Sequence, residues 1–521
     1  MEKQLPKNWV ETSPLEISKI IRGVSYGKSD AFQSEFDNSC LILRGGNIQD
    51  GEIVDGKDNV YVPLDLIKKD QFIQKHDVII VGSTGSKNLI GKAATSLFDS
   101  NKISFGAFLM NIRAYEPINK RYFSYYFQTN YYREAIRNLA GGVNINNIRK
   151  EYIENLYFPL PPLAEQNRIV AKLDVLFAQL ETIKTSMAKV PLLLKDFRQQ
   201  VLTQAVTGKL TEEWRKGKEL ESGLSTILQN RNKYYESLVK ENKKYGLKVP
   251  KKLDYSEYEE FELSDSYKLP EYWKKSNLKN IADLITDGEH ATPKRTEDGY
   301  YLLSARNVQN GFISLNNVDY VPKEEYDRIK KRCNPEHKDI LISCSGTVGR
   351  VSIVPENLEF VMVRSAALVK FQSNTEISKF IEYTLRSDFG QSQILKLQKS
   401  TAQANLFLAP IGKIVVPIPS IIEQQEIVSR VESLFAKADA IEKQYETLKA
   451  KIDSLPQAIL HKAFKGELTE QLDSDGDARE LLREIEALKA SAGKSKSKKT
   501  EVKRTKTFSS KNEILGMVAE K

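Results

Sequence analysis

An internal repeat constrains the fold of this chain more than any other feature. Residues 159–212 and 417–470 align without a gap at a constant separation of 258 positions (417 minus 159), and 17 of the 54 aligned pairs are identical. Glu165 matches Glu423, for example, and the alignment runs to a shared Gly-x-Leu-Thr-Glu string. A register held over this length predicts that the chain contains one structural unit twice.

The segments that precede the two copies also correspond, although the separation drifts by a few positions. Each contains a Leu-Pro pair followed by a tryptophan, an Asn-x-Gln-x-Gly string, a Tyr-Val-Pro string, and an Asp before three apolar residues. They are residues 5–6, Trp9, 47–51, 61–63 and 77–80, and residues 269–270, Trp273, 307–311, 320–322 and 339–342. The drift indicates loops of different length on a shared scaffold. The predicted order is therefore globular domain, helix, globular domain, helix.

Length and charge limit the possible classes of protein. A chain of 521 residues is too long for one compact core. The formal net charge of +9 suggests an anionic partner, with nucleic acid the first candidate. Residues 494–521 carry nine of the basic and three of the acidic side chains, so most of the excess lies in the tail. The repeat is therefore stronger evidence than the charge.

The cysteines and the apolar residues bear on the compartment. Three cysteines cannot form a disulfide framework, which favours a reducing compartment. The chain starts without the apolar stretch of a signal peptide, and no window approaches 18 consecutive apolar residues. We expect a cytoplasmic protein that does not enter a membrane.

The repeated segments have a coiled-coil pattern. Apolar residues alternate at spacings of four and three. The predicted seam consists of Ile169, Leu173, Leu176, Leu180, Ile183, Met187, Val190 and Leu194 in the first copy, and of Ile427, Val431, Leu434, Ala438, Ile441, Tyr445, Leu448 and Ile452 in the second. Pro191 within the first pattern predicts a kink.

The narrow seam favours two helices that pack on each other as an antiparallel pair. A helix of this kind spans about 50 Å at ~1.5 Å per residue, so the pair would separate the two globular domains like a ruler. The alternative is that each helix packs only on its own domain.

The globular parts are predicted to be mixed α/β domains. Short apolar runs at 78–81, 340–342 and 367–371 are bounded by turn-forming residues, as strands are. Residues 121–139 have the aromatic periodicity of a helix with a buried face.

The sequence divides into six parts. They are a first globular domain (1–158), a central helix (159–212), a charged Tyr- and Lys-rich linker with a helix near 219–244 (213–268), a second globular domain (269–412), a distal helix (413–470) and a disordered basic tail (471–521). The tyrosines of the linker are expected in helix packing or at a partner surface rather than stacked on bases.

Motifs for catalysis are missing. Residues 85–92 (GSKNLIGK) resemble a phosphate-binding loop, but the glycine spacing is wrong by one and Ala93 replaces the required Ser or Thr. No Asn-Pro-Pro-aromatic string of an amino-methyltransferase is present. Cys333, His337 and Cys344 have a loosely metal-like spacing without a fourth ligand, so no metal site is predicted. Four histidines leave little material for acid–base catalysis. The chain is predicted to bind rather than to catalyse.

The doubled Pro-Leu/Ile-Pro-x-x-x-Glu-Gln block, with Ile-Val, Leu-Phe and the closing Gly-x-Leu-Thr-Glu, resembles the conserved regions of type I restriction–modification specificity subunits. The resemblance covers roughly residues 5–470 and has the family's order of parts. Residues 286–293 (TDGEHATP) and the Asp-Ile-Leu-Ile-Ser and Gly-Thr-x-Gly strings at 339–350 resemble elements of the family's recognition domains. The first domain lacks the Asp-Gly-x-His element, so its mode of recognition can differ.

The resemblance implies a function and a set of partners. Each recognition domain would read one half of an asymmetric bipartite target in double-stranded DNA, and the helices would set the spacer. Two modification (methyltransferase) subunits would dock along the helices, and restriction subunits would add ATP-dependent translocation and cleavage. S-adenosylmethionine, Mg²⁺ and ATP would belong to those partners, with no cofactor on this chain, in the cytoplasm of a bacterium or archaeon. The competing hypothesis is a coiled-coil scaffold that organises other proteins without binding DNA.

Loop residues that could read base edges are the candidate DNA contacts, since Arg, Lys, Asn, Gln, Ser and Thr are the usual readers. The candidates are Tyr26, Lys28, Arg44, Ser83, Thr84, Ser86, Lys87, Asn144 and Asn146 in the first domain, and Thr286, His290, Thr292, Lys294, Arg295, Arg306, Ser345, Thr347, Gln403 and Asn405 in the second.

Overall fold

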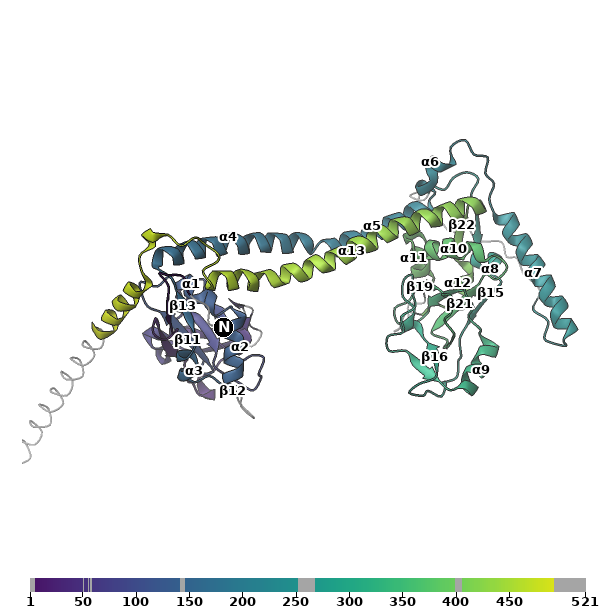
Figure 1. Cartoon of the computed structure of the whole chain (residues 1–521). Coiled ribbons are helices and arrows are strands. Elements are labelled where there is room, and N and C mark those ends of the chain that lie inside the picture. The colour runs from purple at the N-terminus through teal and green to yellow at the C-terminus, as the bar shows by residue number, and fades with distance from the viewer. Residues whose placement is uncertain are drawn as a thin grey trace, which may run out of the picture. The chain divides into compact units, whose positions relative to one another are not determined.

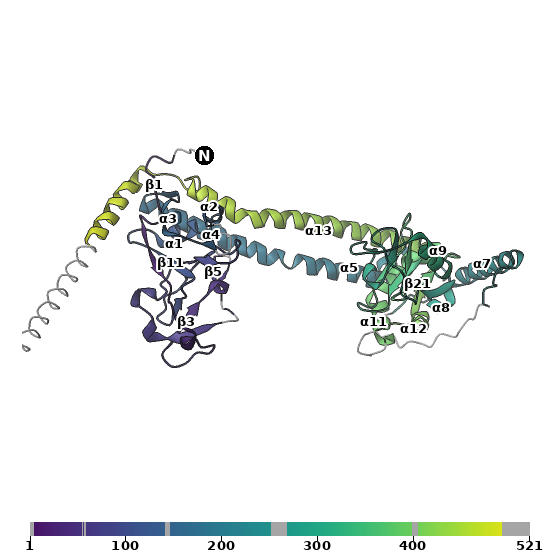
Figure 2. The same ribbon diagram turned by 90° about the horizontal axis from the view of Figure 1, so that it is seen from below.

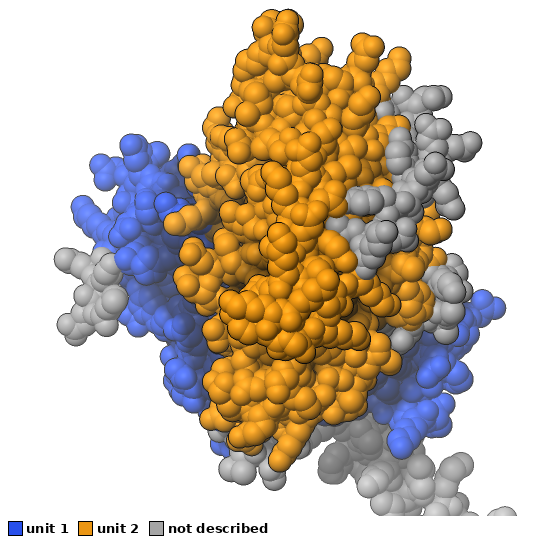
Figure 3. All heavy atoms as spheres, turned by 90° about the vertical axis from the view of Figure 1, so that its right-hand side faces the viewer, with its two compact units in different colours: residues 1–187, 447–521 blue, residues 188–446 orange. Residues whose placement is uncertain are grey.

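The computed structural model describes residues 5–49, 51–54, 56, 59–140, 146–251, 268–398 and 405–491. The chain divides into two compact units, which Figure 3 colours separately. Unit 1 is Met1–Met187 with Thr447–Lys521, and unit 2 is Ala188–Glu446. Each unit contains one globular domain and helical segments from both copies of the repeat. In the described part of the chain, no helix is long and apolar enough to cross a membrane.

The first domain is built on two small sheets. A four-stranded antiparallel sheet has the order β2-β11-β7-β9, and a mixed three-stranded sheet has the order β10-β3-β6. Three two-stranded pairs, β1–β13, β4–β5 and β8–β12, complete it. The strands are β1 (Val10–Thr12), β2 (Ser18–Arg22), β3 (Ser39–Leu43), β4 (Ile48–Gln49), β5 (Glu52–Ile53), β6 (Val60–Pro63), β7 (Val78–Val81), β8 (Ser83–Thr84), β9 (Ala93–Thr95), β10 (Ile103–Phe105), β11 (Leu109–Ala114), β12 (Asn146–Asn147) and β13 (Phe158–Leu160).

The second domain repeats this topology. Its four-stranded sheet has the order β15-β21-β18-β19, its three-stranded sheet the order β17-β16-β20, and β14 pairs with β22. The strands are β14 (Lys274–Asn277), β15 (Leu284–Asp287), β16 (Tyr300–Leu303), β17 (Asp319–Val321), β18 (Ile340–Ser343), β19 (Val351–Ile353), β20 (Phe360–Met362), β21 (Ala366–Lys370) and β22 (Val415–Ile418). The expected mixed α/β fold with an internal repeat is confirmed.

The central strands explain why the sequence showed continuous apolar runs. In β7, Val78 and Ile80 enter one core cluster, while Ile79 and Val81 enter another on the opposite face. β18 is divided in the same way between two clusters. A strand covered on both faces has no polar alternation, and the predicted strands at 78–81 and 340–342 are confirmed as β7 and β18.

Short helices cover the domains. They are α1 (Lys120–Tyr126), α2 (Asn130–Leu139) and α3 (Lys150–Glu154) in the first, and α8 (Leu278–Ile281), α9 (Lys323–Arg332), α10 (Ser378–Arg386), α11 (Asp388–Leu397) and α12 (Leu408–Lys413) in the second. Single turns of 3₁₀ helix lie at η1 (Lys28–Asp30), η2 (Gly45–Asn47), η3 (Leu64–Leu66), η4 (Lys69–Gln71), η6 (Ala305–Asn307) and η7 (Thr375–Ile377). The helical segment predicted over 121–139 is confirmed, but it comprises two helices. The first ends at Tyr126, and the hydroxyl of Thr129 accepts from the Tyr132 N–H at the start of α2.

The long helices are α4 (Leu163–Met187), α5 (Val190–Val206) and α13 (Ile421–Phe464). The helix is interrupted at residues 188–189, and Pro191 lies in the first turn of α5, where its missing N–H costs nothing. This interruption agrees with the predicted kink. In contrast, α13 continues through Pro456.

Within each unit the helical segments run antiparallel. In unit 2, Arg198 of α5 contacts Asp439 and Glu442 of α13 at 2.7 Å each, while Arg430 donates to the carbonyl of Leu210 at 2.9 Å. In unit 1, α4 and the end of α13 share a core cluster that includes Leu173. Figures 1 and 2 show α5 alongside the first part of α13.

The seam is only partly buried. Ile169, Leu173, Leu180, Leu194, Ile427, Val431 and Ala438 are buried. The prediction is wrong for Ile183, Ile441 and Leu448, which are 44%, 49% and 51% exposed. Where a helix lies beside a domain, residues of that domain also cover its seam. Elsewhere only the partner helix covers the seam, and two helices bury only a narrow strip of each other.

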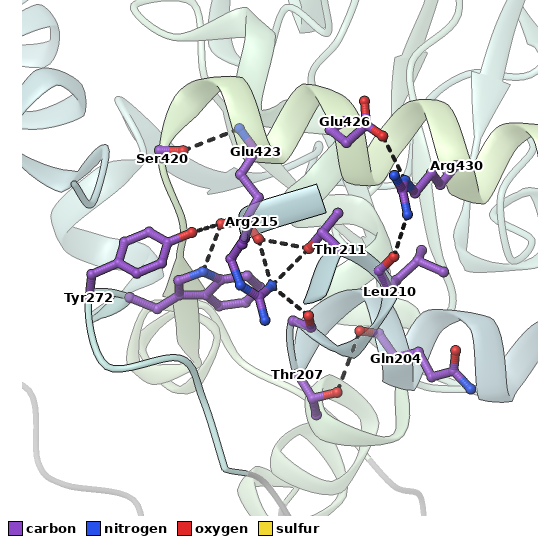
Figure 4. A network of polar contacts seen from close by, with 12 residues as sticks. Gln204, Thr207, Leu210, Thr211, Arg215, Tyr272, Ser420, Glu423, Glu426 and Arg430 are labelled. Carbon is purple, nitrogen blue, oxygen red and sulfur yellow. Dashed lines mark hydrogen bonds and ion pairs between the residues drawn. The ribbon is translucent and has the colours of Figure 1, made fainter. Parts of the chain in front are cut away.

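Each glutamate of the repeated pair, Glu165 and Glu423, joins a helix start to a domain and to the end of the other helical segment in its unit. Glu423 of α13 accepts hydrogen bonds from Trp273 Nε1 at 2.9 Å, Thr211 Oγ1 at 2.7 Å and Arg215 at 2.8 Å, and from the Tyr272 hydroxyl. Figure 4 shows this network. We call it, with its counterpart around Glu165, the glutamate junction.

In the counterpart, Glu165 of α4 accepts from Trp9 Nε1 at 2.8 Å, Gln471 Nε2 at 2.9 Å and Thr469 Oγ1 at 3.3 Å. The glycine of the closing motif adopts a left-handed conformation against a proline of the domain. A Cβ on Gly208 would lie 2.6 Å from Pro270 Cγ, and one on Gly466 would lie 2.5 Å from Pro6 Cγ.

The repeat continues beyond the closing motif. After η5 (Lys209–Thr211) and α6 (Glu212–Arg215), α7 (Leu224–Lys244) buries Ile227 and packs on the second domain. After η8 (Asp473–Asp475), residues 478–491 are helical and bury Ile485 in the core of unit 1. These two isoleucines are again 258 positions apart (485 minus 227).

The predicted boundaries at 213 and 471 need correction. Disorder from residue 471 is wrong for residues 471–491, because this segment supplies apolar side chains to a core and Asp475 pairs with Arg168 at 2.5 Å. The predicted linker helix is confirmed as α7 but belongs to unit 2. Residues 252–267 of the linker and 492–521 of the tail lie outside the described residues.

Candidate nucleic-acid interface

Five chain segments of the first domain meet around the turn that joins β10 to β11. The Gly82 N–H donates to the Phe108 carbonyl at 2.9 Å, and the Gly106 N–H donates to the Leu43 carbonyl at 2.9 Å. The Val24 N–H donates to Phe105, the residue before the turn, at 2.7 Å, and Ile148 bonds back to the carbonyl of Gly82 at 2.8 Å. The segments are residues 23–28, 44–47, 82–87, 106–108 and 146–148, and we call them the five-segment face of the first domain.

The second domain builds the same face with equivalent hydrogen bonds. Cys344 donates to the Ser365 carbonyl at 2.8 Å, Val363 to Leu303 at 3.0 Å, Glu289 to Met362 at 2.8 Å, and Leu406 to Cys344 at 3.0 Å. The segments are residues 288–295, 304–307, 344–349, 363–365 and 405–406. The two faces therefore share a backbone framework, and only their side chains and loop lengths differ.

A glycine permits the close backbone approach in each face. A Cβ on Gly23 would lie 2.1 Å from the carbonyl oxygen of Gly106, and a Cβ on Gly288 would lie 2.0 Å from that of Met362. No side chain fits at these distances. Gly288 therefore shapes the framework rather than contacting DNA through a side chain, and Gly23 is its counterpart.

The structure gathers most of the first domain's candidate residues in its face. Thr84 of β8 pairs with Asn146 of β12, and the Asn146 side chain donates to the Thr84 carbonyl at 3.3 Å. The Ser86 N–H donates to Thr84 Oγ1 at 3.3 Å, which orders the loop. Arg44 starts η2 with an exposed side chain.

The remaining candidates of this domain differ in exposure. Lys28 and Lys87 are exposed, Ser83 is half-buried, and Tyr26 is half-buried against a small core cluster. Asn146 is buried, so its role in the face is to hold the β8–β12 pair. Asn144 lies outside the described residues.

In the second domain, two candidate arginines converge on one carboxylate. Arg295 Nε lies 3.1 Å from Asp319 Oδ2, and Arg306 lies 2.7 Å from Asp319 Oδ1. Both guanidinium groups remain about half exposed. One acid thus holds two basic groups at the surface, which leaves a positive charge available to a phosphate or a base.

The other candidates of the second face lie on its loops. Ser345 forms a β-bridge with Asn405, the counterpart of the β8–β12 pair. His290 Nε2 lies 2.8 Å from Asp287 Oδ2 and the ring is exposed. The remaining four, which are half-buried Thr286 and exposed Thr292, Lys294 and Thr347, lie along the same segments or at the end of β15. Gln403 lies outside the described residues.

An ion pair stiffens this loop further. The backbone N–H of Ala291 and the Arg328 guanidinium, 2.8 Å away, hold the pKa of the Glu289 carboxyl below its usual range. Glu289 is therefore charged and committed to its partners. It acts as a brace for the loop that carries His290.

Two large exposed side chains of the faces, on the turns at 106–108 and 363–365, were not among the sequence candidates. Phe108 is 72% exposed, and Arg364 is exposed on the equivalent turn of the second domain. A large side chain in a turn of three residues between two buried strands was the available signal. The sequence candidates were restricted to loops rich in turn-forming residues, and this restriction missed both.

The described residues contain no group of three or more His, Cys, Asp or Glu side chains that could hold a metal ion. Cys333 and Cys344 are buried, and burial raises the pKa of each thiol to about 12. The arrangement of exposed basic, hydroxyl and amide groups on rigid turns suits contact with an anionic, hydrogen-bonding surface.

Comparison with known proteins places the two repeats in one family. The family model described as "Type I restriction modification DNA specificity domain" matches residues 6–192 and 270–450. The EcoKI specificity subunit of Escherichia coli K12 is 30% identical over 504 residues, which cover 94% of this chain and 97% of that protein. The StySPI specificity subunit of Salmonella potsdam is 31% identical, covering 95% and 99%.

Solved structures share the fold. A chain from a study of complex assembly and conformational transition of the type I R-M system has a TM-score of 0.55 at 16% identity and covers 89% of this chain and all of its own. The HsdS subunit from Thermoanaerobacter tengcongensis has a TM-score of 0.52 at 17% identity, covering 89% and 99%.

Proposed function

Because this chain belongs to the type I restriction–modification DNA specificity family, we propose that it is the DNA sequence-recognition subunit of a type I complex and performs no catalytic step itself. Methyl transfer, translocation and cleavage then belong to the modification and restriction subunits. The relatives named above are specificity subunits of type I restriction enzymes.

One observation carries the proposal. The five-segment face occurs twice, on the same framework of backbone hydrogen bonds, but it carries different side chains in the two domains. The loop at 82–87 of the first face carries Thr84, Ser86 and Lys87. The equivalent loop at 344–349 of the second face carries Ser345 and Thr347. Two equivalent scaffolds with different contact groups suit two different half-sites, and thus an asymmetric bipartite target.

The long helices suit the second part of the role. Residues of α13 belong to both units without a break in the helix, so we propose that it sets the spacer between the half-sites. Apolar side chains lie exposed along the helices: Val175, Ile183, Leu448 and Leu455 in unit 1, and Leu192, Leu193, Phe197 and Ile441 in unit 2. Rows of this kind mark protein-binding surfaces, and we assign them to the modification subunits.

Methylome sequencing tests the proposal. A host that expresses this chain with its modification subunits should carry one bipartite methyladenine motif, and deletion of this chain alone should remove it. Replacement of residues 1–155 by those of another family member should change one half-site and leave the other unchanged. An identical methylome with and without the chain, in a host with active modification subunits, would reject the proposal.

A further inference from the structure

The turns at residues 106–108 and 363–365 have an unusual position in the two faces. Each follows a strand that pairs in parallel with the centre of its sheet, and each is held by backbone hydrogen bonds to neighbouring segments. Gly82 and Ser83 donate to the Phe108 carbonyl at 2.9 and 3.1 Å, and Cys344 donates to the Ser365 carbonyl at 2.8 Å. The turns are therefore rigid, and they lie where the other four segments of each face meet.

Each turn presents one large exposed side chain. Phe108 leaves 72% of its surface in contact with solvent, although burial of a phenyl group would stabilise the fold. Arg364 is exposed, and its guanidinium makes no hydrogen bond or ion pair with any residue that the structure describes. Arg295 and Arg306 differ from Arg364 because each of them forms an ion pair with Asp319.

The exposed side chain differs in position as well as in chemistry. Phe108 is the third residue of its turn, whereas the third residue of the other turn is Ser365, whose hydroxyl accepts from the Ala305 N–H at 3.0 Å. In the second domain this position therefore serves the framework, and the exposed group moves to Arg364. Phe108 and Arg364 have no structural role in turns that are otherwise equivalent. We infer that the two turns contact chemically different partners.

We propose that Phe108 and Arg364 are specificity-determining residues, one for each half-site. The inference rests on the proposed function. Phe108 makes an apolar contact with the methyl group of a thymine in the first half-site, and Arg364 donates both hydrogen bonds of its guanidinium edge to O6 and N7 of a guanine in the second. These are the partners that aromatic and guanidinium side chains select in the major groove.

Phe108→Ala and Arg364→Ala test the assignment, with one control in each domain. Phe98 is a second exposed phenylalanine of the first domain, and its loop bonds to His76 and Asp77 at the opposite end of β7. Lys338 is an exposed cation at the corresponding end of β18. Phe98→Ala and Lys338→Ala therefore remove the same kind of group away from the faces.

In methylomes of hosts with the modification subunits, Phe108→Ala should relax one A·T position of the first half-site. Arg364→Ala should relax one G·C position of the second. The expected loss of discrimination at that position is on the order of 10-fold or more, and the controls should methylate the parental motif at the parental level. Parental motifs and levels in both test variants would overturn the assignment, as would a second half-site without a G·C pair.

DNA binding by the purified complex tests the assignment for variants whose methylation is too weak to define a motif. Uracil in place of the contacted thymine should weaken binding of the unaltered complex on the order of 10-fold but leave binding of the Phe108→Ala complex unchanged. Deazaguanine, which lacks N7, in place of the contacted guanine should weaken binding of the unaltered complex but leave binding of the Arg364→Ala complex unchanged. Equal sensitivity of parent and variant at every thymine or guanine overturns the inference, while an unaltered chain without any bipartite motif rejects the proposed function itself.

Discussion

The indole Nε1 of Trp273 donates to the carboxylate of Glu423 at 2.9 Å, and Glu423 is completely buried. This contact connects the first residues of the second domain to the first turn of α13. Trp9 and Glu165 make the equivalent contact in unit 1 at 2.8 Å. Both glutamates of the repeated Glu-Gln pairs are therefore internal hydrogen-bond acceptors rather than surface groups.

Glu423→Ala should loosen unit 2. The substitution leaves Arg215 and Trp273 without their buried acceptor, and breaking a buried charge pair costs about 3 kcal/mol. Hydrogen exchange should speed up at residues 208–215 and 268–274 but not in unit 1. Glu426→Ala is the control, because Glu426 pairs with Arg430 at the surface and should change protection little. Unchanged protection in Glu423→Ala would contradict the importance of the glutamate junction.

Gly23→Ala should disrupt the first face. The new methyl group would lie 2.1 Å from a backbone oxygen, so the turn at 106–108 must move, at a cost of about 3 kcal/mol or more. Methylation should decline through loss of the first half-site. Gly45→Ala is the matched control, because a Cβ there meets nothing within 4 Å. Equal methylation by both variants would show that this close approach is not required.

Charging the exposed row of α5 should impair assembly. Leu192 and Leu193 are 60% and 61% exposed, and their replacement by Glu should reduce recovery of the modification subunits in a pull-down by 10-fold or more, as expected for central interface residues. Lys195→Glu, at another exposed position of the same helix, should have a smaller effect. If both variants recover the subunits equally, the assigned docking surface is wrong.

The docking of residues 478–491 should depend on pH. The hydrogen bond from Arg168 lowers the pKa of the Asp475 carboxyl below its ordinary value of 3.8. A lowered folded-state pKa means that the stabilisation is present above the ordinary value and is lost as the pH falls below about 4. Protection of 478–491 should therefore exceed that in Asp475→Asn at about pH 6, and the difference should shrink as the pH is lowered below about 4 through the lowered folded-state pKa. A difference that stays constant throughout this acid titration would exclude this ion pair as its source.

Alkylation provides a simple check on the cores. Cys40, Cys333 and Cys344 are buried, and burial raises each thiol pKa to about 12. Iodoacetamide reacts with thiolates, so all three should remain unlabelled in the native chain near pH 8 and become labelled in denaturant, as mass spectrometry can measure. Rapid native labelling of any one would contradict its placement.

The identities of the repeat now have a physical explanation. They fall in residues 159–183 and 199–212 and their counterparts, and none falls between. Gln199 and Gln457 are an example: Gln199 donates to Asp388 at 2.7 Å, and Gln457 donates to the Gln128 carbonyl at 2.9 Å, each at a turn between two helices of its domain. The stretches without identities, residues 184–198 and 442–456, are mostly exposed, so few packing contacts constrain their side chains.

The sequence alone determined the duplicated plan, the strands and helices with strong periodicity, and the family, because these depend on local pattern and on a register of 258 positions. Only the tertiary structure decided which loops meet. The contacts that join residues 23–28, 82–87 and 106–108 are backbone hydrogen bonds, which the pattern of side chains in the sequence does not reveal. The same reason hid Phe108 and Arg364, whose significance comes from the turns beneath them, and also the helix at 478–491, whose few apolar residues find their partners only in the folded core.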